Sequence, residues 1–416
     1  MFKVIEAFSG IGAQAKALEK LNIEFDIVHT CDWDINAIIA YNRIHNPSAE
    51  QNLYPDKSDE DIDSFLREVT LSMNGKEAIN ERAYARLTDK FKRILYSAIQ
   101  DTRNLVSITD VKGFDIPDDI DLFTYSFPCQ DLSMCGYWHG NKSGIARDAH
   151  NRSGMLWEVE RILKEMQSLG KRLPRFLLME NVTNILSSTH KNDFDDWKRT
   201  LNNLGYYNKI YKLNARDFGV PQKRERAYML SIQYNGDETI WHELNRYFTY
   251  NNLENSDIAN LYSERSFSLK DVLKLDYTNE EYRKEADIAQ PNNTPSRQKI
   301  WRENDILFDE NGIREICVNT VTTKQDRNPN SGLITYKNGK EGKSEWRYLT
   351  PRECFILMGF DESDYSRITG NDLEYAAKRP LFTNEKLIKM AGNSICVDVL
   401  AALFRQVIEI QKIISN

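Results

Sequence analysis

The chain has 416 residues and a formal net charge of −7, and this length suggests two or three domains. Hydrophobic residues make up 41% of it, which excludes a disordered chain. The acidic balance argues against nucleic-acid binding unless Lys and Arg gather on one face. We find no apolar run near the roughly 18 residues that span a bilayer and no signal-peptide layout. We therefore expect no membrane partner and a cytoplasmic location.

Short apolar runs alternate with amphipathic stretches through the first part of the chain. We predict strands at 4–8, 25–31, 121–127 and 176–180, helices at 13–21, 35–44, 155–167 and 195–205, and a pair of strands around 207–213 and 226–232. This alternation is typical of an α/β fold, here a doubly wound, Rossmann-like domain with a mixed, mostly parallel sheet. Ligands of such sheets bind at the carboxyl ends of the strands.

Two segments break this alternation. Residues 48–104 are polar and helix-prone, which predicts a helical insertion. Residues 236–345 are rich in Asn, Asp, Glu and Lys and show no alternation. A helical pattern returns near residue 385, and we expect its apolar end to pack on the first domain. The expected division is a first domain of 1–235 completed by 380–416, and a smaller irregular domain of 236–379.

A glycine-containing turn follows the first predicted strand. FSGIG (8–12) lets the backbone turn tightly and approach a ligand. The next strand ends in CDWD (31–34), where an acidic residue can bind ribose hydroxyls and Trp33 can cover an adenine ring. A plain strand-to-helix turn, a helix cap by Asp34 and a core tryptophan are the alternative interpretations.

Polar motifs also follow two later strands. SFPCQDLS (126–133) presents Cys129, a candidate nucleophile if a local positive field activates its thiol. The alternative is a buried cysteine, although its polar neighbours make a poor core. LLMENV (177–182) runs into Glu180, a candidate acid whose pKa burial would raise. A helix-capping turn explains this second motif equally well.

The last two motifs are cationic and small-polar. Arg224 and Arg226 alternate on an expected strand and so share a face, where they can hold a phosphate or a polarised ring oxygen. A solvated strand edge is the alternative. GNS (392–394) either closes over a cofactor or caps a helix through Asn393 or Ser394. The six cysteines show no metal-ligand spacing, so we expect free thiols and no metal.

In this order, the motifs resemble those of the DNA (cytosine-5)-methyltransferases of the bacterial restriction-modification type. The resemblance covers residues 3–235 and 345–410, and includes RYLTPRECFILMGF (347–360) and AGNSICVDV (391–399). The catalytic motifs YSFPCQDLS and LLMENV are most similar to those of the CG-specific methyltransferases of mollicutes. Those enzymes also carry extra residues where 48–104 lies here.

The resemblance implies transfer of a methyl group from S-adenosylmethionine to carbon 5 of a cytosine flipped out of duplex DNA. A covalent Cys129 adduct is implied, with Glu180, Arg224 and Arg226 as the other catalytic residues. The cofactor-binding positions that it implies are Phe8, Gly10, Ile11, Gly12, Asp32, Trp33, Asp110, Pro128, Asn393 and Ser394. Asp110 falls where an acid contacts the adenine amine. The implied partners are double-stranded DNA and a cognate restriction endonuclease, and the implied enzyme is a monomer.

The domain of 236–379 is then the target-recognition domain. Its candidate DNA contacts are Arg297, Lys299, Arg302, Lys324 and Arg327, each of which also reads as a surface charge. Thr320-Val321 stands where the family usually has Thr-Leu. The loop of about 134–153, with Lys142, Arg147 and Arg152, is expected to close over DNA. In it, Cys135 departs from the usual Ser or Gly.

Three other functions stay as alternatives. An RNA cytosine methyltransferase is disfavoured by the lack of a Cys-Phe-Thr motif. A catalytically silent DNA-binding homologue is disfavoured by intact Cys129, Glu180 and Arg226. A dinucleotide-dependent oxidoreductase explains only the glycine turn and its acid. The target sequence and the role of 48–104 stay open.

Overall fold

A six-stranded sheet with the order β2-β1-β3-β4-β7-β5 forms the centre of the computed structural model, which describes residues 1–128, 152–263, 266–327 and 330–414. The strands are β1 (Phe2–Ala7), β2 (Phe25–Cys31), β3 (Leu122–Tyr125), β4 (Phe176–Val182), β5 (Tyr206–Asn214) and β7 (Glu225–Gln233). The first four pair in parallel, and β7 pairs antiparallel with β4 and β5. The predicted mixed, mostly parallel sheet is confirmed.

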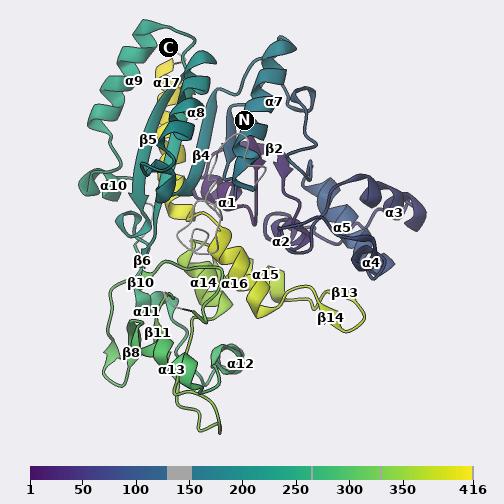
Figure 1. Ribbon diagram of the computed structural model, residues 1–416, viewed down its shortest axis with the longest axis vertical. Helices are drawn as coiled ribbons and strands as arrows, with labels where there is room; N and C mark the ends of the chain where they lie inside the picture. Colours follow the sequence, from purple (N-terminus) through teal and green to yellow (C-terminus); the bar gives the residue numbers. More distant parts are fainter. Residues whose placement is uncertain (129–151, 264–265, 328–329, 415–416) are drawn as a thin grey trace.

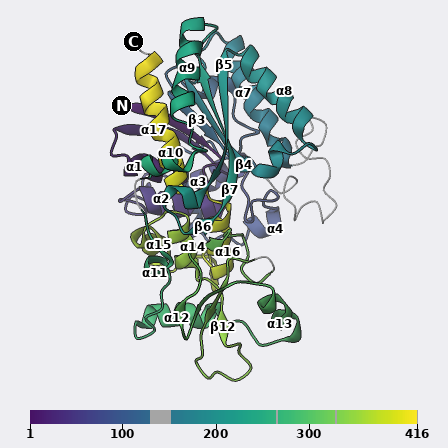
Figure 2. The same ribbon diagram turned by 90° about the vertical axis from the view of Figure 1, so that its left-hand side faces the viewer.

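Helices cover both faces of this sheet (Figures 1 and 2). One face packs against α1 (Ala13–Lys20) and α17 (Val397–Ile414), and the other against α7 (Leu156–Ser168) and α8 (Lys191–Asn203). Strands that are buried on two faces need near-continuous apolar runs, and β3 and β4 have them. Short 3-10 helices complete the connections: η1 (Gly113–Asp115), η2 (Arg152–Met155), η3 (Thr183–Leu186) and η4 (Ala215–Phe218).

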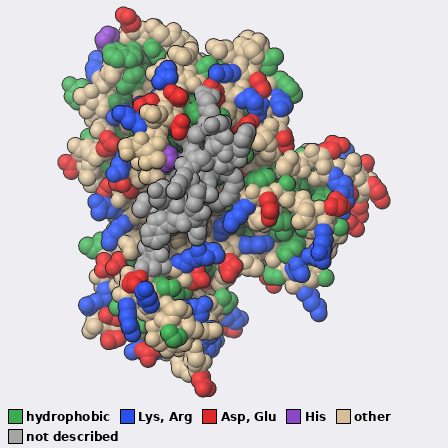
Figure 3. All heavy atoms as spheres, viewed as in Figure 1, with side chains coloured by type: hydrophobic (Ala, Val, Ile, Leu, Met, Phe, Trp, Pro, Cys, Tyr) green, Lys and Arg blue, Asp and Glu red, His purple; other side chains and the backbone are tan. Residues whose placement is uncertain are grey.

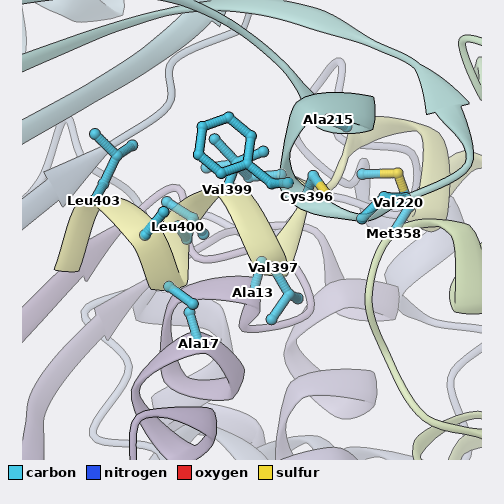
Figure 4. Packing of buried hydrophobic residues seen from close by; sticks show 14 of the residues in the cluster. Ala13, Ala17, Ala215, Val220, Met358, Cys396, Val397, Val399, Leu400 and Leu403 are labelled. Atoms are coloured by element: carbon cyan, nitrogen blue, oxygen red, sulfur yellow. The ribbon is translucent and has the colours of Figure 1, made fainter. Parts of the chain in front are cut away.

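The C-terminal helices are part of the core. Among the described residues, Asn384–Ile414, which holds α16 (Asn384–Asn393) and α17, is long and apolar enough to cross a membrane, which differs from the prediction of no such run. However, 83% of its most apolar window is buried. In Figure 4, Val397 and Leu400 of α17 lie beside the small Ala13 and Ala17 of α1. Packing against the sheet therefore accounts for this hydrophobicity.

Segment 48–104 is helical and shares a hydrophobic cluster beside the sheet with Ile35, Ile38 and Ile39. Its helices are α3 (Asp59–Glu68), α4 (Glu81–Tyr84) and α5 (Asp89–Asp101), which pack on α2 (Ile35–His45). Polar caps define their starts, because the Ser58 and Thr88 side chains accept hydrogen bonds from the backbone of the first turn.

A smaller, irregular region lies at the opposite end from α9 and carries a second sheet with the order β12-β11-β8-β9 (Figure 1). Its strands are β8 (Ile306–Asp309), β9 (Gly312–Ile313), β11 (Leu333–Thr335) and β12 (Trp346–Arg347). Its helices are α11 (Leu269–Val272), α12 (Glu280–Ala289) and α13 (Pro295–Arg302). The short strand β10 (Val318–Asn319) leaves this region and pairs with β6 (Gln222–Lys223) of the first domain.

The helices α9 (Glu238–Tyr250) and α10 (Ser256–Leu261) follow the expected boundary at residue 236 but pack with the first domain. The hydroxyls of Tyr247 and Tyr262 both donate to the Glu409 carboxylate of α17, each at 2.6 Å. On these contacts we propose a domain boundary after α10. The chain then returns through α14 (Pro351–Leu357), α15 (Glu362–Thr369) and the hairpin of β13 (Glu374–Ala376) and β14 (Arg379–Pro380).

One carboxyl group is fully buried under the first helices. Glu6 of β1 is 0% exposed. Burial raises its pKa from 4.5 to about 8, although the nearby Tyr41 hydroxyl acts in the opposite direction. The folded chain therefore holds a proton on Glu6 at neutral pH, whereas the unfolded chain does not.

This difference predicts a pH-dependent cost. Between pH 4.5 and about 8, only the folded state binds the proton, so the contribution of Glu6 to stability falls as pH rises. Glu6→Gln removes the titrating group. We expect the melting temperature of Glu6→Gln minus that of the wild type to increase steadily from pH 5 to pH 8. Thermal melts across this range test the prediction, with the exposed Glu68→Gln as control. A constant offset between Glu6→Gln and the wild type would show that Glu6 is ionised in the fold.

Candidate active site

A cavity of about 300 Å³ opens where the parallel strands end, which is within the size range of small-molecule sites. Its wall takes residues that follow β1, β2 and β3 and the last part of β4. Because β7 runs antiparallel, its start lies at the same edge, with Arg226 opposite Val182. Most predicted site residues line the cavity: Phe8, Gly10, Ile11, Asp32, Trp33, Pro128, Glu180, Arg224, Arg226, Asn393 and Ser394.

The glycine turn approaches the cavity as predicted. Gly10 has a φ of +55°, and a Cβ built on it would meet no atom within 4 Å, so the space in front of it is open to a ligand. Gly12 serves packing instead, because a Cβ there would lie 2.2 Å from His45 Nε2. Phe8, also with a positive φ of 58°, is held in a conformation that costs energy for a side chain with a Cβ.

Asp32 is fixed at the end of β2 by two backbone donors. Its Oδ2 accepts from the Gly10 N–H at 2.9 Å, and its Oδ1 accepts from the Asp34 N–H at 2.8 Å. Burial, and then the charge of Asp34, raise the pKa of Asp32 to about 6, so it is ionised at neutral pH. A carboxylate has about four acceptor positions, which leaves two for ligand hydroxyls. With Trp33 beside it, this donor and acceptor set fits an adenosine-containing cofactor.

Glu180 and Arg226 face each other on the cavity wall. Glu180 Oε1 lies 3.5 Å from Arg226 Nε, with side chains 12% and 17% exposed. Burial raises the pKa of Glu180, and the guanidiniums of Arg226 and Arg224 oppose this shift only in part. The carboxyl group therefore keeps its proton to higher pH than a free glutamate, which suits a proton donor.

Asn181 connects Glu180 to the segment that leads into Cys129. Its Nδ2 donates to the Phe127 carbonyl at 3.1 Å, and the side chain is 2% exposed. Ser126, Phe127 and Pro128 all line the cavity. Cys129 itself lies outside the described residues, as do Cys135, Lys142 and Arg147 of the predicted mobile loop.

Arg224 lies between β6 and β7 and Arg226 lies on β7; both line the cavity, but their contacts differ. The Arg224 guanidinium donates to the carbonyls of Val321, Gly392 and Ser394, at 2.9, 3.1 and 2.8 Å. Burial, and then the charge of Arg226, lower the pKa of Arg224 to about 10, which leaves it charged at neutral pH. Its hydrogen bonds hold its own segment to those of Val321 and of Gly392–Ser394. Among the described residues, Arg226 donates only to the Glu225 carbonyl.

Gln222 connects the end of α14 to the segment that contains Val321. Its Nε2 donates to the Leu357 carbonyl at 2.8 Å, and its Oε1 accepts from the Val321 N–H at 2.9 Å. The Thr320 hydroxyl donates to the Lys223 carbonyl at 2.7 Å. The predicted Thr320-Val321 pair thus lies against β6, the short strand that precedes Arg224.

Other predicted residues lie outside the cavity lining. Asp110 is exposed, and its Oδ2 accepts from the Thr70 hydroxyl at 3.0 Å. The candidate DNA contacts Arg297, Lys299, Arg302, Lys324 and Arg327 lie at the surface of the smaller region. Arg152 begins η2.

Sequence reasoning missed several lining residues, and three of them come from segments without a predicted motif. Thr70 and Gly75 come from the helical insertion, and Lys389 comes from α16. The Lys389 ammonium lies 3.1 Å from Asp34 Oδ2. No motif in 48–104 indicates a ligand. Thr70 is a single residue among charged helices, and a single threonine forms no recognisable sequence pattern.

The chain is similar to known proteins over most of its length. Residues 69–409 match the family described as C-5 cytosine-specific DNA methylase. The chain is 34% identical over 408 residues to the orphan methyltransferase M.SssI of Spiroplasma monobiae, covering 97% of both chains. It is 30% identical over 412 residues to the type II methyltransferase M2.ScrFI of Lactococcus lactis subsp. cremoris, covering 99% of this chain and 100% of that one.

A solved structure extends the likeness to the fold. The S. pombe Dnmt2 methyltransferase matches with a TM-score of 0.58 at 18% identity, covering 98% of this chain and 99% of that chain. At this identity the match speaks for a shared fold.

The contrast between the two arginines is testable. Arg224→Lys replaces a fork that reaches three carbonyls with one ammonium, and each buried carbonyl left without a donor costs about 1–3 kcal/mol. We expect a clear drop in thermal stability for Arg224→Lys and little change for Arg226→Lys, measured by calorimetry on both variants. Equal melting temperatures would contradict the role of Arg224 in holding the three segments together.

Proposed function

The chain belongs to the C-5 cytosine-specific DNA methylase family, and from this premise we propose that Cys129, Glu180 and Arg226 act together on one cytosine base. The enzyme is a DNA (cytosine-5)-methyltransferase, and its cofactor is S-adenosylmethionine. The observation that carries the proposal is the facing pair of Glu180 and Arg226 on a cavity wall that also holds Pro128, the neighbour of Cys129.

The base must first leave the helix. Carbon 5 of a paired cytosine is out of reach, and rotating the nucleotide out of the duplex costs a few kcal/mol. The Cys129 thiolate then bonds to carbon 6, and the electron pair displaced from the 5,6 double bond makes carbon 5 nucleophilic. The cofactor supplies an electrophilic methyl group. Loss of the carbon 5 proton and expulsion of the thiolate restore the double bond and the enzyme.

Glu180 supplies the proton that this attack requires. Negative charge builds up on the ring as the thiolate adds, and a protonated Glu180 can donate to ring nitrogen 3. Arg226, 3.5 Å from Glu180, can pair with oxygen 2 of the same base. Because the Arg224 guanidinium is bound to three carbonyls, we assign it a positioning role in place of the predicted base contact.

The cofactor would be held at the ends of β1 and β2. Asp32 would accept the ribose hydroxyls, Trp33 would cover the adenine, and the open face of Gly10 would admit the backbone of the ligand. The remaining positions are those predicted: Phe8, Ile11, Pro128, Asn393 and Ser394 at the lining, with Gly12 shaping the turn and Asp110 beside it.

DNA would lie between the helical insertion and the smaller region. Lys and Arg side chains gather along the notch between these two parts in Figure 3, so the net charge of −7 does not prevent binding of phosphates. We assign base recognition to the smaller region and closure over DNA to the loop of about 134–153. The enzyme would act as a monomer in the cytoplasm. The names orphan and type II of its two relatives leave a lone enzyme and a cognate endonuclease as alternatives.

The first test reads the product directly. DNA from cells that express the protein should show, by bisulfite sequencing, one short motif methylated at carbon 5 of cytosine. Cys129→Ala should abolish this signal. Among the described cysteines only Cys31 lines the cavity, and its thiol is buried. Cys317→Ala, away from the cavity, should keep it. Methylation that survives Cys129→Ala would remove Cys129 from the mechanism, and no methylation in any sample would favour an RNA substrate or a silent homologue.

The second test concerns the proton of Glu180. Since the protonated form is the active one, turnover should fall as pH rises through the raised pKa of Glu180. Glu180→Gln cannot donate this proton, and we expect about 10²–10³-fold slower turnover without the alkaline fall. Single-turnover rates against pH, together with the Kd for S-adenosylhomocysteine, measure both effects. An alkaline fall that persists in Glu180→Gln would show that another group titrates.

A further inference from the structure

The helical insertion of 48–104 is built into the end of β2. The Ser72 N–H donates to the Trp33 carbonyl at 2.8 Å, and the Ile35 N–H donates to the Ser72 carbonyl at 2.9 Å. These two bonds form a parallel bridge between Asp34 and Ser72. The insertion therefore continues the backbone pairing of the main sheet at the point where Asp32 and Trp33 meet the cavity.

The side chain of Trp33 connects the insertion to the cavity. Trp33 lines the cavity and also packs on the insertion's hydrophobic cluster, which includes Ile62, Leu66 and Leu71. All three of these residues are 1% exposed. The orientation of the indole thus depends on a core that the insertion supplies.

The insertion also contributes to the wall itself. Thr70 and Gly75 line the cavity. Gly75 has a φ of +64°, and a Cβ on it would lie 2.9 Å from Asp34 Oδ2. The Lys389 ammonium of α16 bonds both to Asp34 Oδ2, at 3.1 Å, and to the Asn74 carbonyl. The C-terminal helix, the end of β2 and the insertion therefore meet at one side of the site.

Thr70 makes the contact that bears on ligand choice. Its hydroxyl donates to Asp110 Oδ2 at 3.0 Å, and the Thr109 hydroxyl donates to Asp110 Oδ1 at 3.2 Å. The Asp110 N–H is held by the Ser107 carbonyl at 2.9 Å. Asp110 is thus an exposed carboxylate with each oxygen fixed by a hydroxyl, next to two residues, Thr70 and Thr109, that line the cavity. A carboxylate so held keeps acceptor positions for a donor from the ligand.

We propose that the insertion completes the cofactor site and that Thr70 is a positioning residue, which holds the Asp110 carboxylate for the exocyclic amine of adenine. This inference rests on the proposed function, because it takes the cavity as the S-adenosylmethionine site. The chemistry is selective: an amine donates to a carboxylate, whereas the exocyclic oxygen on carbon 6 of a 6-oxopurine is an acceptor and would be repelled by it. Thr70 thereby contributes to the preference for adenine. The insertion of 48–104, which has no recognisable motif, then has a role in the cofactor site.

Two ligands separate this role from a merely structural one. S-adenosylhomocysteine carries the amine, and S-inosylhomocysteine carries an oxygen in its place. Calorimetry on the full chain gives the Kd of each for the wild type, Thr70→Val, Thr70→Ser and the control Ser64→Ala, whose side chain is exposed on α3. We expect Thr70→Val to bind S-adenosylhomocysteine about 2- to 10-fold more weakly. Its binding of S-inosylhomocysteine should change less, so the preference between the two ligands narrows.

The matched variants decide the outcome. Thr70→Ser keeps the hydroxyl and should restore the wild-type preference, and Ser64→Ala should not alter it. A Thr70→Val protein with the wild-type preference would overturn the inference, as would equal weakening toward both ligands. Because the preference is a ratio within one protein, a partly unfolded sample lowers both affinities and leaves it unchanged. If the wild type binds neither ligand, the proposed function fails, which is a different result from a wild type that binds and a Thr70→Val that behaves identically.

Discussion

A single buried guanidinium fixes how the two halves of the site meet. The Arg224 fork binds carbonyls from two other segments, Val321 between β10 and β11, and Gly392 and Ser394 at the junction of α16 and α17. A buried cation is costly unless its donors are paired, so these segments cannot separate without exposing or orphaning it. Gln222 adds the last residue of α14 to the same group. The smaller region, for which we propose base recognition, is therefore hydrogen-bonded to the segment that leads into the strand edge of Glu180 and Arg226.

Burial at that edge acts on two carboxyl groups with different results. Both Asp32 and Glu180 have raised pKa values because the cavity wall removes them from water. Asp32 has two backbone N–H donors on its oxygens, which favour the anion and suit a hydrogen-bond acceptor. Within the described residues, Glu180 pairs with the Arg226 cation at 3.5 Å and its carboxylate accepts no backbone hydrogen bond, which suits a group that exchanges a proton. The immediate partners of each carboxyl group, more than its burial, decide whether it acts as a hydrogen-bond acceptor or as a proton donor.

Much of this arrangement could be predicted from local patterns. The strand at 25–31 and its acidic end, the glycine turn and the Glu180 motif each depend on neighbours within a few residues, and the structure has them where expected. What local patterns miss is contact between distant segments. The role of Arg224 as a tie depends on backbone carbonyls, which any residue supplies, so the sequence carries no sign of it. The boundary that we propose after α10, in place of the one expected at 236, rests on apolar contacts of α9 with α17 that become visible only in three dimensions.

The insertion shows the same limit from the other side. Its sequence predicts a helical insertion without a stated role, and the structure pairs its backbone with that of Trp33. A segment inserted between two cofactor-binding positions lies close to the ligand, since both of its ends are anchored at the strand edge. Once its core packs against Trp33, a ligand that binds the folded wall also stabilises the insertion, by an amount that grows with the ratio of ligand concentration to Kd. Cofactor binding and the folding of this segment are then coupled, which explains how a sequence without ligand motifs can belong to the site.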